Sequence, residues 1–133
     1  MRFEAERWLN EALYDLETAK ILHREKRWNA ACFYSQQAAE KAAKALLYFI
    51  NQSPWGHSIV KLLERFSDST GEDLSKLYPK AMELDRLYMP SRYPNMIPEK
   101  TPHEVFDKTV SERAVKYAEE IIEFVRQRIK KGN

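Results

Sequence analysis

The feature that most constrains the fold is a series of alanines spaced for helix packing. Two stripes of mostly small residues recur at alternating intervals of four and three. The first comprises Ala5, Leu9, Ala12, Leu16 and Ala19, and the second comprises Ala31, Ser35, Ala38, Ala42, Ala45 and Phe49. This period predicts two long amphipathic helices. Because small side chains let helix axes approach closely, we expect these helices to pair antiparallel through a turn at residues 23–28.

The second long helix and a short third helix have clear boundary signals. The second helix is expected over residues 29–50, with the Asn29 side chain capping its start. A short apolar stripe predicts a helix over residues 59–66, and either Ser58 or His57 is placed to cap it.

A fourth helix is indicated by an apolar stripe over residues 74–88. Thr70 and Asp73 precede it with the spacing of a capping box, although Asp replaces the usual Glu or Gln. Pro79 lies inside the run, and because it lacks a backbone donor it is expected to kink the helix or divide it into two segments.

A proline-rich loop over residues 89–102 leads to the last helix, which ends near Lys130. Thr101 and Glu104 resemble a capping box with Pro at the first helical position. No strand pattern competes with these helices. The sequence therefore predicts an all-α fold, an up-and-down four-helix bundle with an additional short helix, in one domain over residues 1–133.

Composition limits the class of protein. The chain has 133 residues and a net charge of +2, too small a charge to indicate nucleic-acid binding by itself. Cys32 is its single cysteine, which excludes an internal disulfide, and its neighbours predict a buried core residue rather than a nucleophile. No apolar run is long enough to span a bilayer, and no signal peptide is seen. We expect a soluble cytoplasmic protein without a membrane segment.

Several families of enzyme lack their motifs here. The three histidines have no acid three residues before them, so the Glu-x-x-His pairs of a di-iron bundle are missing. One cysteine cannot supply a Cys/His zinc site. No glycine-rich phosphate loop or nucleophile elbow occurs. The sequence therefore predicts no metal, no cofactor and no catalytic residues of these kinds.

The segment LDRLYMPSRYPN at residues 84–95 holds the strongest candidate site. Two prolines stiffen a loop that presents aromatic, cationic and polar side chains, and such loops on a rigid scaffold commonly bind ligands. Arg92 is suited to binding phosphate through two N–H groups or to stacking on a base. The alternative for Arg92 is an ordinary salt bridge to Asp85. The candidate ligand-binding residues of this segment are Asp85, Tyr88, Arg92, Tyr93 and Asn95.

Polar residues of the second helix and His57 complete the candidates. Glu40 and Lys44 form a favourable pair four residues apart, and a solvated helix face is the simpler interpretation of this region. His57 is included among the ligand-binding residues, although a role as a helix cap or loop donor is favoured over a role as a base. The polar residues are Gln36, Gln37, Glu40, Lys41 and Lys44.

Three segments in series resemble signatures of the HEPN domain, whose name stands for higher eukaryotes and prokaryotes nucleotide-binding. They are FYSQQAAEKAAKALL at residues 33–47, GHSIVKLL at residues 56–63 and LDRLYMPSRYPN at residues 84–95. The resemblance implies a helical bundle that forms a homodimer. It also implies pairing with a minimal nucleotidyltransferase, as toxin and antitoxin in some systems. Many relatives are metal-independent ribonucleases with an Arg-x4–6-His motif.

This chain departs from that motif. The positions that would hold the histidine are occupied by Ile97, Pro98 and Glu99, and His103 comes later. The sequence therefore favours a nucleotide- or RNA-binding and interaction protein over an enzyme. Two alternatives stay open: a ribonuclease in which His103 or His57 replaces the motif histidine, and a purely structural helical adaptor.

Aromatic residues support the homodimer. Their number exceeds what a small bundle core encloses, so we expect some of them in an exposed patch that a second copy covers. They are Trp8, Trp28, Trp55 and Tyr48.

Overall fold

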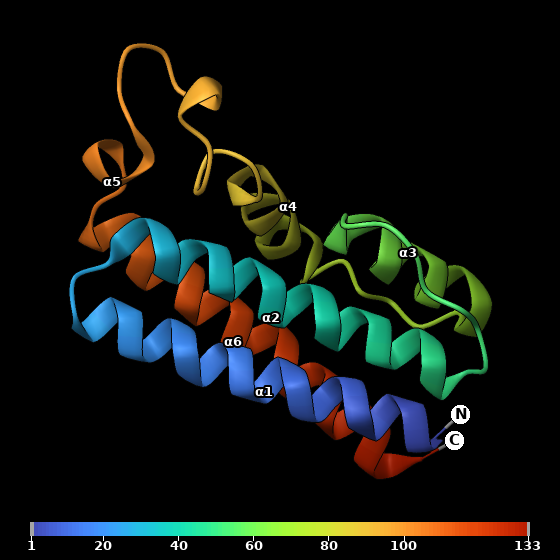
Figure 1. The fold of residues 1–133 in the computed structure, drawn as a ribbon. Helices are drawn as coiled ribbons and strands as arrows, with labels where there is room; N and C mark the ends of the chain where they lie inside the picture. Colours follow the sequence, from blue (N-terminus) through green and yellow to red (C-terminus); the bar gives the residue numbers. More distant parts are fainter. Residues whose placement is uncertain (1, 133) are drawn as a thin grey trace.

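The computed structural model describes residues 2–132, and three long helices form the body of the molecule (Figure 1). They are α1 (Arg2–Arg24), α2 (Trp28–Phe49) and α6 (Lys108–Lys131). Helix α2 contacts both of the others, and α1 also contacts α6. The start of α1 lies beside the end of α6, with Nη2 of Arg2 donating to the carbonyl of Ile129 at 3.2 Å, and a short turn reverses the chain between α1 and α2, so α1 runs antiparallel to both α2 and α6. The predicted antiparallel pairing of the first two helices is confirmed.

Shorter elements complete the fold on the side of α2 away from α1 (Figure 1). Helix α3 (Ile59–Thr70) and helix α4 (Tyr78–Leu87) contact each other and α2. A 3-10 turn, η1 (Pro94–Met96), and a one-turn helix, α5 (Pro102–Val105), follow before α6. Every regular element of residues 2–132 is helical, so the predicted all-α fold class is confirmed.

The core owes its close packing to the alanine stripes. Small residues of both predicted stripes are fully buried between α1 and α2, and the larger aliphatic residues fill the space toward α3 and α6. Cys32 is buried with them, and burial raises the pKa of its thiol to about 12. A thiol with so high a pKa is protonated at neutral pH, which agrees with the predicted core role.

Two boundary predictions for α2 and α3 need correction. Helix α2 begins one residue earlier than predicted, with the carbonyl of Arg27 accepting from the N–H of Ala31 at 2.9 Å. Asn29 therefore lies in the first turn and is no cap; its Nδ2 donates to the carbonyl of Ser91 at 3.1 Å. The cap of α3 is Ser58, whose hydroxyl accepts from the N–H of Lys61 at 3.1 Å.

The predicted capping box before the fourth helix is wrong. Thr70 is instead the last residue of α3, and its hydroxyl donates to the carbonyl of Phe66 at 2.8 Å. The chain turns away at Gly71, whose φ of +78° suits a residue without Cβ. Helix α4 then starts at Tyr78 with Pro79 in its first turn, where a missing N–H costs nothing. Pro79 thus divides the predicted run rather than kinking it.

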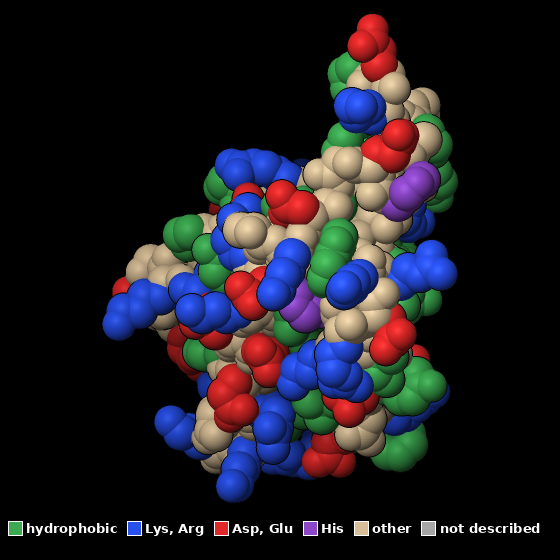
Figure 2. Space-filling view, turned by 90° about the vertical axis from the view of Figure 1, so that its left-hand side faces the viewer, with side chains coloured by type: hydrophobic (Ala, Val, Ile, Leu, Met, Phe, Trp, Pro, Cys, Tyr) green, Lys and Arg blue, Asp and Glu red, His purple; other side chains and the backbone are tan. Residues whose placement is uncertain are grey.

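The capping box at Thr101 is confirmed, but it serves α5 rather than the last helix. The carboxylate of Glu104 accepts from the N–H of Thr101 at 3.0 Å. Helix α6 has its own cap, Asp107, whose Oδ1 accepts from the N–H of Val110 at 3.0 Å. The segment between α4 and α6 projects beyond the bundle as a narrow arm (Figures 1 and 2).

Candidate functional site

Arg92 lies at the base of this arm, in a tight turn that continues from α4. The N–H groups of Arg92 and Tyr93 both donate to the carbonyl of Met89 at 3.1 Å. Three rings surround the guanidinium: Cζ lies 4.4 Å from the ring centroid of Phe33 and 4.6 Å from those of Tyr88 and Tyr93. These distances are typical of cation–π contacts, so the side chain is held by aromatic surface.

The Arg92 charge has no carboxylate partner among the residues that the structure describes. Within residues 2–132 its contacts are Nε to the carbonyl of Tyr88 at 3.3 Å, Nη1 to the hydroxyl of Tyr93 at 3.2 Å and Nη2 to the sulfur of Met89 at 3.9 Å. The alternative of a salt bridge to Asp85 is therefore wrong. Since a thioether is a weak acceptor, donor capacity remains on the Nη2 side of the guanidinium.

The Asp85 carboxylate binds the N-terminus of α3 rather than Arg92. Its carboxylate accepts from the N–H of Ile59 at 2.7 Å, from the N–H of Val60 at 3.1 Å and from the hydroxyl of Ser58 at 3.0 Å. Asp85 thus fastens the N-terminus of α3 to α4. Burial raises the pKa of this carboxyl group above its usual value, and the nearby Glu40 adds to the rise, while the three hydrogen bonds oppose it.

His57 joins Arg92 to a buried polar chain on α2. Its ring stacks on Tyr88 with centroids 5.0 Å apart and an angle of 19°. Its Nδ1 lies 3.2 Å from Oε2 of Glu40, a residue whose side chain is only 6% exposed. The same Glu40 oxygen accepts from Nζ of Lys44 at 2.9 Å, and its other oxygen accepts from Nε2 of Gln36 at 3.0 Å.

The structure therefore brings together four of the six predicted ligand-binding residues. His57, Tyr88, Arg92 and Tyr93 form one continuous row, which we call the His57–Arg92 row. Asp85 is directed to the start of α3 instead. Asn95 lies exposed on η1, and its side chain makes no hydrogen bond within the described part of the chain.

One residue of this site, Phe33, was missed from the sequence, and Glu40 was noted there only as part of a polar helix face. Phe33 contacts the Arg92 guanidinium, and Glu40 contacts His57. Both lie on the stripe that includes Gln36 and Lys44, which predicts one helix face. The interpretation of that face as solvated is wrong for Gln36, which is fully buried, and for Glu40, which is 4% exposed. The spacing of these residues along α2 was the signal in the sequence that places Phe33 and Glu40 on the same helix face.

His103 is placed apart from this row. It lies exposed on α5, and its Nδ1 is 3.2 Å from the hydroxyl of Thr101. Among residues 2–132 it makes no hydrogen bond, ion pair or ring contact with the His57–Arg92 row.

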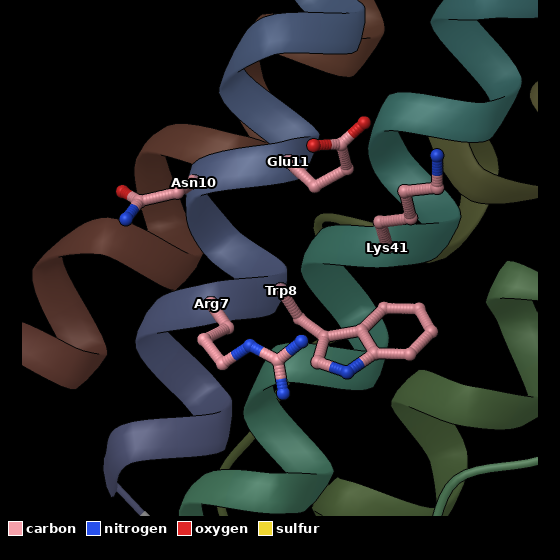
Figure 3. A pocket seen from close by; sticks show the side chains of 5 residues that line it. All are labelled: Arg7, Trp8, Asn10, Glu11 and Lys41. Carbon is pink, nitrogen blue, oxygen red and sulfur yellow. The ribbon is translucent and has the colours of Figure 1, made fainter.

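A groove between α1 and α2 offers a contrasting set of charges (Figure 3). Arg7 and Trp8 of α1 lie side by side in it, with Glu11 and Lys41 beyond them. Both cations of this groove are paired: Nζ of Lys41 lies 2.6 Å from Asp15, and Nη1 of Arg7 lies 2.7 Å from Glu4. An anion would have to displace a carboxylate there, so this groove is the weaker candidate.

The face of the molecule shown in Figure 2 does not favour one sign of charge. On the face shown in Figure 2, lysines and arginines are interspersed with acidic residues. Local geometry at Arg92, rather than a general positive field, is therefore what distinguishes the site. Within residues 2–132, no cluster of three or more potential metal-binding side chains occurs. No helix there is long and apolar enough to cross a membrane.

Comparisons with known proteins identify the family. Residues 5–128 match the HEPN domain model, so the chain belongs to the HEPN family. A curated relative, "Putative toxin MJ1304" from Methanocaldococcus jannaschii, is 30% identical over 95% of this chain and 88% of its own length.

Solved structures agree with this assignment. TT1696 from Thermus thermophilus superposes with a TM-score of 0.89 at 33% identity, covering 93% of this chain and 97% of its own. ST0689, described as an archaeal HEPN homologue, has a TM-score of 0.80 at 35% identity, covering 95% and 98%. An HEPN domain protein from Thermotoga maritima, TM0613, has a TM-score of 0.73 at 35% identity, covering 91% and 95%.

Proposed function

We propose that this HEPN protein binds a phosphate-bearing ligand, a nucleotide or single-stranded RNA, at the His57–Arg92 row. The observation that carries the proposal is the setting of Arg92: a half-buried guanidinium, surrounded by three rings and lacking a carboxylate partner within residues 2–132. A cation of this kind attracts an anion because no internal counter-charge competes.

The geometry also indicates which residue would bind the phosphate of the ligand and which would bind its base. With three rings at contact distance, the guanidinium faces are poorly placed for a further base, so Arg92 would bind phosphate through its N–H groups. Tyr93 is 41% exposed and would present its ring to a base, with the Asn95 amide two residues further along the arm.

Titration of nucleotides and short single-stranded RNAs tests this assignment. Arg92→Ala should weaken binding about tenfold or more, the loss expected for a charge-assisted hydrogen bond. Arg86→Ala is the matched control, because Arg86 is exposed on α4 and pairs with Glu83 at 3.3 Å. Equal binding by the wild type and Arg92→Ala, or binding by neither, would contradict the assignment.

We further propose that the protein acts as a homodimer and pairs with a minimal nucleotidyltransferase in a toxin–antitoxin system. Family membership and the relative named as a toxin support this. Of the four aromatic residues expected in a dimer patch, Trp55 is 71% exposed. Trp8, Trp28 and Tyr48 are half-buried and contribute less exposed surface. Sedimentation should give a dimer at micromolar concentration. Sequencing of the adjacent reading frame should find a minimal nucleotidyltransferase, and co-expression with that protein should yield a complex. A monomer contradicts the dimer, and the lack of such a frame or of a complex contradicts the pairing.

A metal-independent ribonuclease is the second candidate, favoured by the contact between His57 and Glu40. The buried carboxylate of Glu40 lies 3.2 Å from Nδ1 of His57 and orients the imidazole. The His57 side chain is 61% exposed, which leaves its Nε2 for substrate. Nε2 would take the proton of a 2′-hydroxyl while that oxygen attacks the phosphorus. The 5′-oxygen would leave with a proton from water, and Arg92 would stabilise the phosphorane charge.

Incubation of single-stranded RNA with chelator present tests the second candidate. Cleavage that is lost in His57→Ala and Arg92→Ala, and retained in His103→Ala, would support it. Absence of cleavage by the wild type would leave binding as the sole activity of this site.

A further inference from the structure

A groove of about 500 Å³ runs along α3 and begins beside His57. Its volume lies in the range of sites for small ligands. Trp55, His57 and Ser58 line its near end, and Lys61, Leu62 and Arg65 continue it along the helix. Since His57 also belongs to the His57–Arg92 row, the groove and the proposed phosphate site form one continuous surface.

Trp55 is the most exposed large apolar side chain of the described residues, at 71%. Its ring is nevertheless held in place, because Cζ of Arg65 lies 5.4 Å from the ring centroid. Arg65 is itself anchored by hydrogen bonds at 3.1 Å from Nη2 to the side chain of Gln52 and to the carbonyl of Ser53. An indole that is exposed and in contact with a fixed guanidinium is a platform on which a base can stack.

The charges along the groove limit how many nucleotides it can hold beyond that base. Lys61 and Arg65 lie close to Trp55 and suit one phosphate linkage. Glu64 and Asp68 also line the groove, and Asp68 lies two helical turns beyond Lys61. A further phosphate on that side would meet carboxylates, so the electrostatics favour a single additional nucleotide.

We propose that the groove beside Trp55 takes the base of a second nucleotide, so that the ligand of this protein is a dinucleotide unit of single-stranded RNA. This inference rests on the proposed function, because it extends the phosphate site at Arg92. The unit would lie across His57, with one phosphate at Arg92 and the neighbouring base on Trp55.

A length series of oligouridylates tests the proposal by calorimetric titration of the full chain. Affinity should rise about tenfold from the mononucleotide to the dinucleotide, the gain expected from one stacked base, and change little in the tetramer and octamer. Trp55→Ala should remove this gain and leave mononucleotide affinity unchanged, while Trp55→Phe retains most of it. Trp8→Phe, a change of a half-buried tryptophan on α1, is the control and should leave the series unaltered.

A charge reversal tests the limit on length. Asp68→Lys should make the affinity continue to rise at the tetramer, because it replaces repulsion of a phosphate by attraction. An unchanged plateau in Asp68→Lys would overturn the electrostatic limit.

The outcomes separate this inference from the proposed function. If Arg92→Ala leaves mononucleotide affinity unaltered, the proposed function fails. If binding depends on Arg92 but neither length nor Trp55→Ala changes it, only the dinucleotide proposal fails. If Trp55→Ala instead converts a dimer to a monomer without affecting the length series, the groove is a protein interface and the proposal is overturned.

Discussion

The α1–α2 seam and the base of the arm treat positive charge in opposite ways. Lys41 lies against the nearly buried carboxylate of Asp15 across the seam, and Lys44 lies against Glu40 on α2 itself, a carboxylate that also belongs to the candidate site. At the base of the arm, Arg92 lies among rings and has no acidic partner within residues 2–132. The seam charges are therefore committed to the fold, whereas the Arg92 charge is available to a ligand. Mutations in the two regions should affect different properties.

The largest effect on stability should come from the seam. Glu40→Ala should lower the free energy of unfolding by about 3–5 kcal/mol, because it leaves Lys44 buried without its partner. The Lys44 side chain is only 13% exposed, so water cannot compensate well. Urea denaturation measures the change, and Glu123→Ala, which breaks an exposed pair with Arg126, should cost less than about 1 kcal/mol. Equal losses in the two variants would contradict the proposed difference.

A smaller effect is expected at the junction of α3 and α4. Asp85→Ala should cost about 1–2 kcal/mol, because the N–H groups of Ile59 and Val60 lose their acceptor at the start of α3. The same denaturation experiment measures it, and Asp73→Ala, at an exposed turn, serves as the control. If Asp85→Ala is as stable as the wild type, then Asp85 does not fasten α3 to α4.

Arg92→Ala should affect stability still less. Loss of its cation–π contacts should cost at most about 1 kcal/mol, because a partly exposed guanidinium remains well solvated. Thermal unfolding of Arg92→Ala beside Arg86→Ala gives the comparison. A loss as large as that of Glu40→Ala would place Arg92 with the structural charges of the seam.

The smallest effect concerns pH. Because burial raises the pKa of Asp85, the folded protein binds this proton more tightly than the unfolded chain does. The stability gained from protonation is fully present below the unfolded pKa and is lost as pH rises through the folded pKa. Asp85→Asn cannot titrate, so the wild type should gain stability relative to it as pH falls from 7 toward 4. A constant difference between their urea midpoints across that range would exclude the raised pKa.

The helices were predictable because their signals are local. The spacing of Ala5, Ala12, Ala38 and Ala42 predicts the apolar stripes of α1 and α2, and the burial of these residues agrees with that prediction. Capping was less predictable, since Asn29 has a capping side chain but lies two residues beyond the N-cap position of α2. Its amide instead holds the carbonyl of Ser91, a contact across the fold that spacing cannot indicate.

The site was predictable in part for the same reason. Tyr88, Arg92 and Tyr93 are neighbours in the sequence, so their meeting required only a turn. The spacing along α2 places Phe33 and Glu40 on one helix face, but they reach the site because α2 packs beside the arm and the α2–α3 loop, and spacing does not indicate that contact. Asp85 has the right chemistry for a ligand site, but the free N–H groups of α3 compete for its carboxylate.

The salt dependence of RNA binding tests the central claim most directly. If Arg92 contacts a phosphate, the slope of log affinity against log salt concentration should be shallower in Arg92→Ala by about 0.7, the value for one contact with a single strand. Arg86→Ala should keep the wild-type slope. An Arg92→Ala slope equal to that of the wild type would show that this guanidinium does not bind phosphate.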